Sequence, residues 1–168
     1  NLGNIWFISN YKIYLMHPGS DYIRNFVIEN KELNEALKDG IFDINIDDNE
    51  TIWFWAFSNC VHAYNFKTKS LTSYFSKQKE ELRTGDYCLR INQGAGGRKW
   101  ILFGYSGLYY LDQDNREMVA VRLMDQIPSG IFYTDLFIDK SGRVMIFHNY
   151  GLTVYNPETS DIRLIYYS

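Results

Sequence analysis

The sequence repeats itself with a period of about 47 residues, and this period limits what the chain can fold into. Trp6, Trp53 and Trp100 follow one another at intervals of 47 residues, and Met145 comes 45 residues later at the matching place. Each of the four lies in a short apolar run. A repeat of this length is typical of solenoids and propellers, in which each repeat forms one supersecondary unit. The fold is therefore expected to consist of four copies of one unit.

Each unit predicts four short strands, named A to D in chain order. Strand A precedes the tryptophan, and in the second unit Ile44 and Ile46 alternate with polar residues, as in a half-buried strand. Strand B contains the tryptophan, and polar turns separate the strands. Strand A is expected at 41–47, 87–92 and 131–139, strand C at 13–16, 61–64, 108–111 and 152–155, and strand D at 25–28, 71–75, 118–123 and 162–167. The first unit lacks strand A.

Four antiparallel strands in a unit of about 45 residues form a propeller blade. We therefore predict an all-β fold of four-stranded antiparallel β-propeller blades, with about three full blades and one blade that lacks its first strand. The single segment 1–168 is expected to hold blades at roughly 1–30, 40–78, 85–126 and 130–168. The chain is expected to be a fragment of a larger propeller, because it begins in the middle of a repeat.

One connection between units, 31–39, predicts a short helix. Asn30 is a suitable cap, Leu33, Ala36 and Leu37 fall on one face, and Gly40 ends the pattern. We expect at most this one helix.

Composition excludes several classes of protein. A net charge of −3 and an isoelectric point of about 5.6 do not suit a nucleic-acid partner, which requires a basic surface. No apolar run is long enough to cross a bilayer, so we expect this segment to be soluble. Cys60 and Cys88 predict two buried free thiols rather than a disulfide framework.

The titratable residues predict neither a metal site nor catalysis. His17, His62 and His148 occupy unrelated places in their repeats and have no companion cysteines, so we expect no metal and no other cofactor. Most acidic residues lie in turns, where aspartate is favoured for local reasons. A pair of carboxylates that face one another, as a glycoside hydrolase requires, is not expected.

Strand order predicts where a ligand would bind. The B–C turns and the D–A crossings share one end of every blade, and tyrosine and asparagine at that end suit a sugar, with an apolar ring face and directional hydrogen bonds. Trp55 is included among the predicted ligand-binding residues because it breaks the repeat: Ile8, Leu102 and Phe147 occupy its position in the other units. Trp53 and Trp100 recur and are expected to pack between blades. The predicted ligand-binding residues are Trp55, Ser58, Asn59, Asp86, Tyr87, Tyr105, Ser106, Asn149 and Tyr150.

The repeat resembles the two-component regulator propeller repeat over nearly the whole chain. In the last unit the matching residues are Ile138-Asp139, Gly142, Gly151-Leu152 and Tyr155-Asn156-Pro157. The earlier units match at Trp53, Trp100, Gly107-Leu108, Tyr64-Asn65 and Pro128-Ser129-Gly130. The chain departs from the pattern where Glu50 replaces a turn glycine, Lys12 and Cys60 replace the glycine before strand C, and Met145 replaces the tryptophan.

The resemblance implies a periplasmic sensor region of a hybrid two-component sensor histidine kinase, of the kind common in gut Bacteroidetes. The implied function of this segment is non-catalytic sensing of oligosaccharides, within a parent protein that a membrane helix anchors. The alternatives are a polysaccharide-degrading propeller enzyme and a propeller scaffold that mediates only dimerisation. The expected partners are an oligosaccharide ligand, and either further blades of the parent protein or a second copy of the chain.

Overall fold

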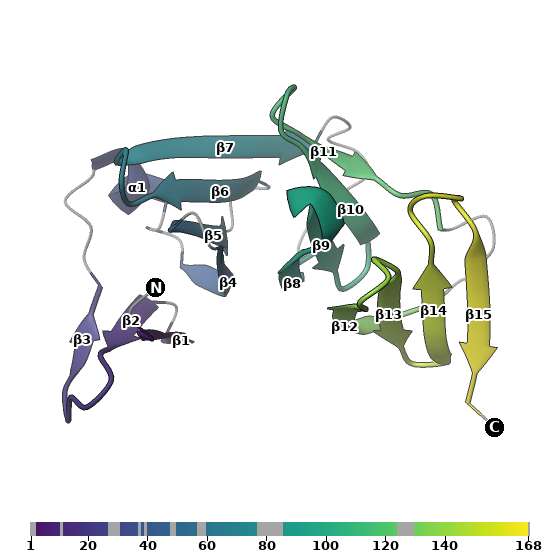
Figure 1. Ribbon diagram of the computed structural model, residues 1–168, viewed down its shortest axis with the longest axis horizontal. Coiled ribbons are helices and arrows are strands. Elements are labelled where there is room, and N and C mark those ends of the chain that lie inside the picture. Colours follow the sequence, from purple (N-terminus) through teal and green to yellow (C-terminus); the bar gives the residue numbers. More distant parts are fainter. Residues whose placement is uncertain are drawn as a thin grey trace. The chain divides into compact units, whose positions relative to one another are not determined.

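The computed structural model describes residues 3–10, 12–26, 31–36, 38, 40–47, 50–56, 60–76, 86–123 and 130–167. The chain divides into two compact units, Asn1–Phe75 and Ser76–Ser168. Almost all of the regular structure in the described residues is antiparallel strand (Figure 1).

Unit 1 contains two sheets. Blade 1 is a three-stranded sheet in the order β1 (Ile5–Ser9), β2 (Lys12–Met16) and β3 (Ile23–Asn25). Blade 2 follows the short helix α1 (Lys31–Ala36), which lies where the sequence predicts a helical connection. The strands of blade 2 pair in chain order as β4 (Ile41–Ile46), β5 (Thr51–Ala56), β6 (Cys60–Asn65) and β7 (Ser70–Ser76).

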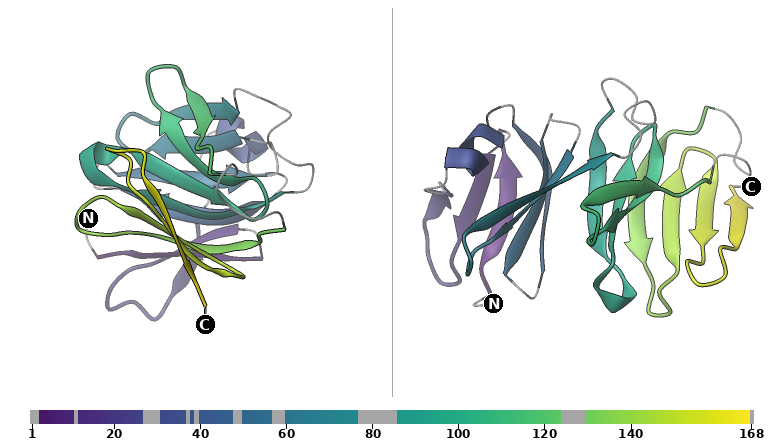
Figure 2. Two further views of the ribbon diagram at one scale, coloured as in Figure 1. Left: turned by 90° about the vertical axis from the view of Figure 1, so that its right-hand side faces the viewer. Right: turned by 90° about the horizontal axis from the view of Figure 1, so that it is seen from above.

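Unit 2 contains two four-stranded sheets, whose strands also pair in chain order. Blade 3 consists of β8 (Cys88–Gln93), β9 (Lys99–Phe103), β10 (Gly107–Asp112) and β11 (Glu117–Ala120), with the 3-10 turn η1 (Ala95–Gly97) between its first two strands. Blade 4 consists of β12 (Tyr133–Ile138), β13 (Val144–His148), β14 (Gly151–Tyr155) and β15 (Ile162–Tyr166). Figure 2 shows the twist of the strands within blade 4. The predicted fold class, three full blades and one without its first strand, is confirmed.

The inner strands of unit 2 are apolar because both of their faces are covered. All five residues of β9 are buried, and β13 alternates between buried and half-buried positions. One core joins blades 3 and 4, and Trp100, 2% exposed, packs in it against residues of β12 and β13 such as Leu136 and Ile146. The prediction that Trp100 is buried between blades is confirmed.

The core of unit 1 joins blades 1 and 2 in the same way. Ile13 of β2 packs with Ile41, Ile52 and Phe54 of blade 2. Trp6 contributes a ring that stacks on Phe66 at a centroid distance of 5.5 Å. Trp53 is also buried, at 5% exposed, as the sequence predicts.

The A–B turns of blades 2, 3 and 4 have one length and share one closing backbone hydrogen bond. The strand register pairs Asn45 with Trp53, Asn92 with Trp100 and Phe137 with Met145, which is a separation of eight residues each time. In each turn an amide donates to the carbonyl four residues later: Asp47 to Thr51 (3.1 Å), Gly94 to Arg98 (2.8 Å) and Asp139 to Arg143 (3.0 Å). Residues 47, 94 and 139 are therefore equivalent.

Candidate functional site

The candidate site lies in unit 2, at the end of blade 3 where the chain enters β8 and turns from β9 to β10. Asp86 connects these two segments. Its Oδ1 accepts hydrogen bonds from the amides of Tyr87 (2.8 Å) and Tyr105 (3.1 Å), and its Oδ2 accepts one from the amide of Ser106 (2.6 Å). Hydrogen bonds to an ionised carboxylate are strong, so Asp86 fixes the B–C turn against the start of strand A.

Three aromatic rings gather beside this turn. Tyr87 and Tyr105 meet edge to face at a centroid distance of 6.1 Å, and Phe132 lies 5.3 Å from Tyr105 and 6.4 Å from Tyr87. Gly104 permits the close approach, because a Cβ there would lie 3.1 Å from Cζ of Tyr87. We call Tyr87, Tyr105 and Phe132 the aromatic cluster.

Blade 4 presents a related arrangement at its B–C turn. The side-chain oxygen of Asn149 accepts a hydrogen bond from the amide of Phe132 (2.9 Å), and the amide of Asn149 donates to the carbonyl of Phe132 (3.1 Å). Asn149 thus connects this turn to the aromatic cluster. Tyr105 and Tyr150, the residue that follows Asn149, are 41% and 45% exposed, so both side chains reach solvent.

The phenol of Tyr87 remains a hydrogen-bond donor at neutral pH. Burial raises the pKa of Tyr87, and the neighbouring Tyr105 and the negative charge of Asp86 raise it further. The site therefore offers ring faces and a hydroxyl donor at a surface that Asp86 and Asn149 brace. Such a surface suits a ligand with both apolar and hydroxyl-bearing faces.

The structure brings together six of the nine predicted ligand-binding residues, from Asp86 to Tyr150, at this end of unit 2. Ser58 and Asn59 lie outside the described residues. Trp55 does not fit the prediction: it is 2% exposed and belongs to the buried interior. The reason is that β5 is covered on both of its faces, since every residue from Thr51 to Trp55 is buried.

Sequence reasoning missed Phe132. The register pairs Cys88 with Phe103 and Tyr133 with His148, so Tyr87 and Phe132 occupy the same place in consecutive blades. An aromatic residue directly before strand A in two blades is the signal that would have revealed it.

The histidines of the strands serve local structure. His148 is 2% exposed; its Nδ1 accepts a hydrogen bond from the amide of Tyr150 (3.3 Å), so the ring is neutral and Nε2 donates to Oγ1 of Thr153 (3.1 Å). His62 lies against Ser73 (Nδ1 to Oγ, 2.9 Å) and Cys60 (Nε2 to Sγ, 3.1 Å), and burial lowers its pKa to about 4. Cys60 and Cys88 form no disulfide within the described residues, and both are buried, as predicted.

The described residues contain no group of three or more histidine, cysteine or acidic side chains that is placed to hold a metal ion. In the same part of the chain, no helix has the length and apolar character that crossing a membrane requires.

Solved structures of β-propellers resemble this chain. An extracellular domain of a B. thetaiotaomicron protein described as a one-component system matches with a TM-score of 0.69 and 16% identity, over 98% of this chain and 24% of that one. A second B. thetaiotaomicron extracellular domain, from a hybrid two-component system, matches with a TM-score of 0.56 and 17% identity over 96% of this chain and 28% of its own. A streptogramin B lyase matches with a TM-score of 0.70 and 16% identity over 96% of this chain and 50% of the lyase.

This chain therefore spans about a quarter of the first of these proteins and half of the lyase. The β-propeller domain of Doa1 and the propeller of Dos1 also match, with TM-scores of 0.61 and 0.58 at 10% and 16% identity, and this likeness establishes the propeller fold. No family model matches the sequence. No curated protein matches it either.

Proposed function

We propose that this chain is a non-catalytic, ligand-sensing propeller segment of the periplasmic sensor region of a hybrid two-component regulator. Two observations support the proposal. The repeat resembles the two-component regulator propeller, and extracellular domains of B. thetaiotaomicron signalling proteins have a similar fold. The segment then lies outside the inner membrane, as part of a membrane-anchored protein, and presents a surface to ligands.

The proposed ligand is an oligosaccharide, and the aromatic cluster carries this proposal. Tyr105 and Tyr150 expose ring faces on which a sugar ring stacks, while the phenol of Tyr87 is a directional donor. Asp86 and Asn149 hold the two turns in place through backbone amides, so the surface is formed before the ligand arrives. A preformed surface lowers the entropic cost of binding.

Titration calorimetry of the protein against a panel of neutral oligosaccharides tests this proposal. We expect at least one sugar to bind and Tyr105→Ala to weaken its binding about tenfold or more, since a stacked aromatic ring at a binding surface is a frequent hot spot. Tyr22→Ala is the matched control, because Tyr22 is 75% exposed in unit 1. A panel without any binder, or equal affinities in the two variants, would contradict the proposal.

An enzyme is the alternative, and the likeness to lyases favours it. Besides the streptogramin B lyase, a catalytically inactive histidine variant of virginiamycin B lyase from Staphylococcus aureus matches with a TM-score of 0.66 and 13% identity. In the present chain both ring nitrogens of His148 are engaged with Tyr150 and Thr153, so this ring is not poised as a base. Product formation from polysaccharides, abolished by His148→Ala in a variant that still binds ligand, would support the enzyme.

A second copy of the chain or further blades are the proposed macromolecular partners. Strands β1 and β3 of unit 1 expose Ile5 (51%) and Ile23 (58%), and β15 of unit 2 exposes Ile165 (42%) and Tyr166 (56%). Exposed apolar side chains at sheet edges promote association. We expect light scattering at micromolar concentration to detect self-association of the 168-residue chain. A monomer at every concentration would contradict this expectation.

A further inference from the structure

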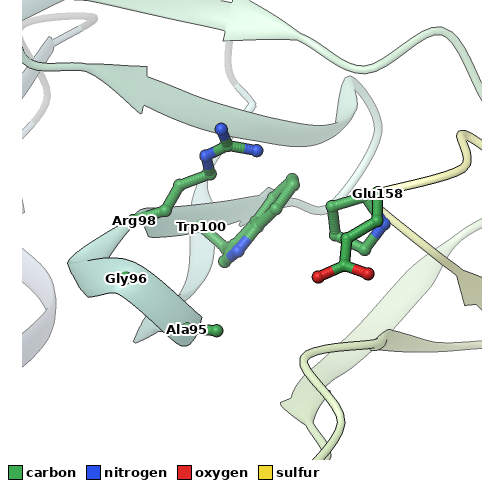
Figure 3. A pocket seen from close by; sticks show the side chains of 6 residues that line it. Ala95, Gly96, Arg98, Trp100 and Glu158 are labelled. Carbon is green, nitrogen blue, oxygen red and sulfur yellow. The ribbon is translucent and has the colours of Figure 1, made fainter.

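Unit 2 contains a hollow at the opposite end of β9 from the aromatic cluster. Its volume is about 470 Å³, and Figure 3 shows it between the A–B turn of blade 3 and the C–D turn of blade 4. A volume of this size suits a small molecule. The lining residues are Ala95, Gly96, Arg98, Trp100, Pro157 and Glu158.

In blades 2 and 4 an aspartate occupies the position of the A–B turn that Gly94 occupies beside the hollow in blade 3. In blade 2, Asp47 Oδ1 accepts from the amide of Thr51 (3.0 Å), and Oδ2 accepts from Nε1 of Trp53 (2.7 Å). In blade 4, Asp139 Oδ1 accepts from the amide of Arg143 (3.0 Å), and Oδ2 accepts from Nε of the same arginine (2.7 Å). The turn carboxylate therefore binds the indole in one blade and the guanidinium in the other.

Blade 3 has both of these donors and lacks the carboxylate. Arg98 stands where Arg143 stands in blade 4, and Trp100 stands where Trp53 stands in blade 2, but the turn residue is Gly94. Within the described part of the chain, the guanidinium of Arg98 has no hydrogen bond or ion pair, and Nε1 of Trp100 has no acceptor. Among the described residues no buried side-chain nitrogen or oxygen atom lacks a hydrogen-bond partner, so the unpartnered indole N–H of Trp100 is accessible, although the residue as a whole is 2% exposed.

Arg98 is nevertheless held in position. Its guanidinium carbon lies 5.8 Å from the ring centroid of Trp100 and 5.2 Å from that of Tyr110. Cation–π contacts of this kind fix the plane of the guanidinium and leave its N–H donors free. A free, oriented guanidinium is the preferred partner of a carboxylate, which it binds through two parallel hydrogen bonds.

Neither Gly94 nor Glu158 on the far wall of the hollow supplies a carboxylate to Arg98 and the indole of Trp100. A Cβ at Gly94 would lie 2.7 Å from Nε1 of Trp100, so the indole occupies the space that an aspartate side chain would need. Glu158 lines the opposite side, and its carboxylate has no partner among the described residues. Because Glu158 repels a bare anion, a bound molecule must also offer N–H or O–H donors to it.

We propose that this hollow binds a small organic carboxylate that also carries hydroxyl or ammonium donors. The carboxylate of the ligand accepts hydrogen bonds from Arg98 and from the indole N–H of Trp100, and its donors bind Glu158. Sugar acids and α-amino acids share this chemistry. The site goes beyond the proposed oligosaccharide surface, since it lies at the other end of the blade and uses other residues.

Titration calorimetry with two matched pairs of probes tests the proposal on the whole protein. D-Glucuronate is compared with glucose, and L-serine with ethanolamine, so that each pair differs by the carboxylate. We expect glucuronate or serine, or both, to bind saturably. The matched probe without the carboxylate should bind about tenfold more weakly or not at all. If only glucuronate binds, the ligand class is sugar acids, and if only serine binds, it is amino acids. If both bind, the hollow recognises the carboxylate that they share.

Variants connect the binding to the hollow. Arg98→Gln should weaken carboxylate binding about tenfold or more, whereas Arg163→Gln, which removes an exposed guanidinium from β15, should leave it unchanged. Trp100→Phe keeps a ring and removes the N–H, and it should weaken binding about threefold. Tyr105→Ala should have no effect, which separates this site from the oligosaccharide surface.

Two results would overturn the proposal. One is the absence of saturable binding for both carboxylates. The other is carboxylate binding that survives Arg98→Gln unchanged in a variant whose melting temperature matches that of the wild type.

Discussion

The A–B turns of blades 2 and 3 have the same length and the same closing hydrogen bond, and each precedes a tryptophan that the two blades use differently. In blade 2 the N–H of Trp53 is bound by Asp47 at 2.7 Å, so the ring and the turn stabilise each other. In blade 3 the equivalent residue is Gly94, and Trp100 forms part of the wall of a hollow. The comparison shows how one turn residue separates a blade whose turn binds the indole N–H from a blade whose indole lines a hollow.

The largest expected effect is shared by the two blades. Trp53→Ala and Trp100→Ala should each lower the free energy of unfolding by about 3–5 kcal/mol, because both rings are buried and little can fill the space they leave. Urea denaturation measures the loss, with Tyr22→Ala as an exposed control. Unchanged melting temperatures for both tryptophan variants would show that the blade register is wrong.

The second-largest expected effect is a loss of stability at low pH that arises in blade 2 and not in blade 3. Blade 2 buries His62, whose pKa falls from 6.5 to about 4 because burial disfavours the charged ring. In blade 3 the position equivalent to His62 is occupied by Tyr109. The unfolded chain binds more protons between these pH values, so stability is full above about pH 6.5 and decreases as the pH falls to about 4. The loss is on the order of 3 kcal/mol.

Denaturation curves at several pH values measure this slope. His62→Gln should flatten it, while His17→Gln, at an exposed residue, should not. Burial also lowers the pKa of His148, and a smaller slope is expected to remain in the His62→Gln variant for that reason. A slope that is equally steep with and without His62 would contradict this assignment.

A smaller difference should separate the two indoles. Trp53→Phe removes the hydrogen bond from the indole N–H to Asp47, whereas Trp100→Phe removes an N–H that has no acceptor among the described residues. Both variants lose similar ring area, so the difference isolates the hydrogen bond. Trp53→Phe should cost about 1–2 kcal/mol more in urea denaturation. Equal costs would mean that the two N–H groups are equivalent.

The smallest effect concerns the aspartate turn of blade 4. Desolvation acts to raise the pKa of Asp139, but hydrogen bonds from Ser141 and Arg143 outweigh it and lower the value from 3.8 to about 2. Its contribution to stability is therefore present above pH 3.8 and is lost as the pH falls toward 2. Carboxyl NMR titration should give a midpoint near 2 that rises in Arg143→Gln. A midpoint at the ordinary value would show that the turn is not organised around this group.

The sequence was sufficient to predict the blades because their signal is repeated. The 47-residue interval between Trp53 and Trp100 corresponds to an equal number of residues in every part of blades 2 and 3, including the A–B turn. Strand type and burial followed from the alternation around these residues. A direct consequence is that Trp53 and Trp100 are both buried, as expected.

The sites were harder to predict because their residues depart from the repeat. Chain order places Asp86 near Tyr105, and the structure shows their hydrogen bond, but only the strand register shows that Phe132 joins them. Trp55 also departs from the repeat, but it is buried and contributes to packing. The hollow beside Arg98 depends on an absent side chain at Gly94 and on Glu158, which comes from another blade. Neither has a local signal in the sequence.

Hydrogen exchange at the indole N–H groups tests the central comparison most directly. The protein has four tryptophans, and Trp53→Phe and Trp100→Phe assign two of the indole signals in a ¹H–¹⁵N spectrum. We expect the Trp53 signal to exchange slowly and to ignore added glucuronate and serine, and the Trp100 signal to exchange faster and to shift with the carboxylate that binds. Equal protection of the two signals, or a carboxylate-dependent shift at Trp53 and none at Trp100, would contradict the account.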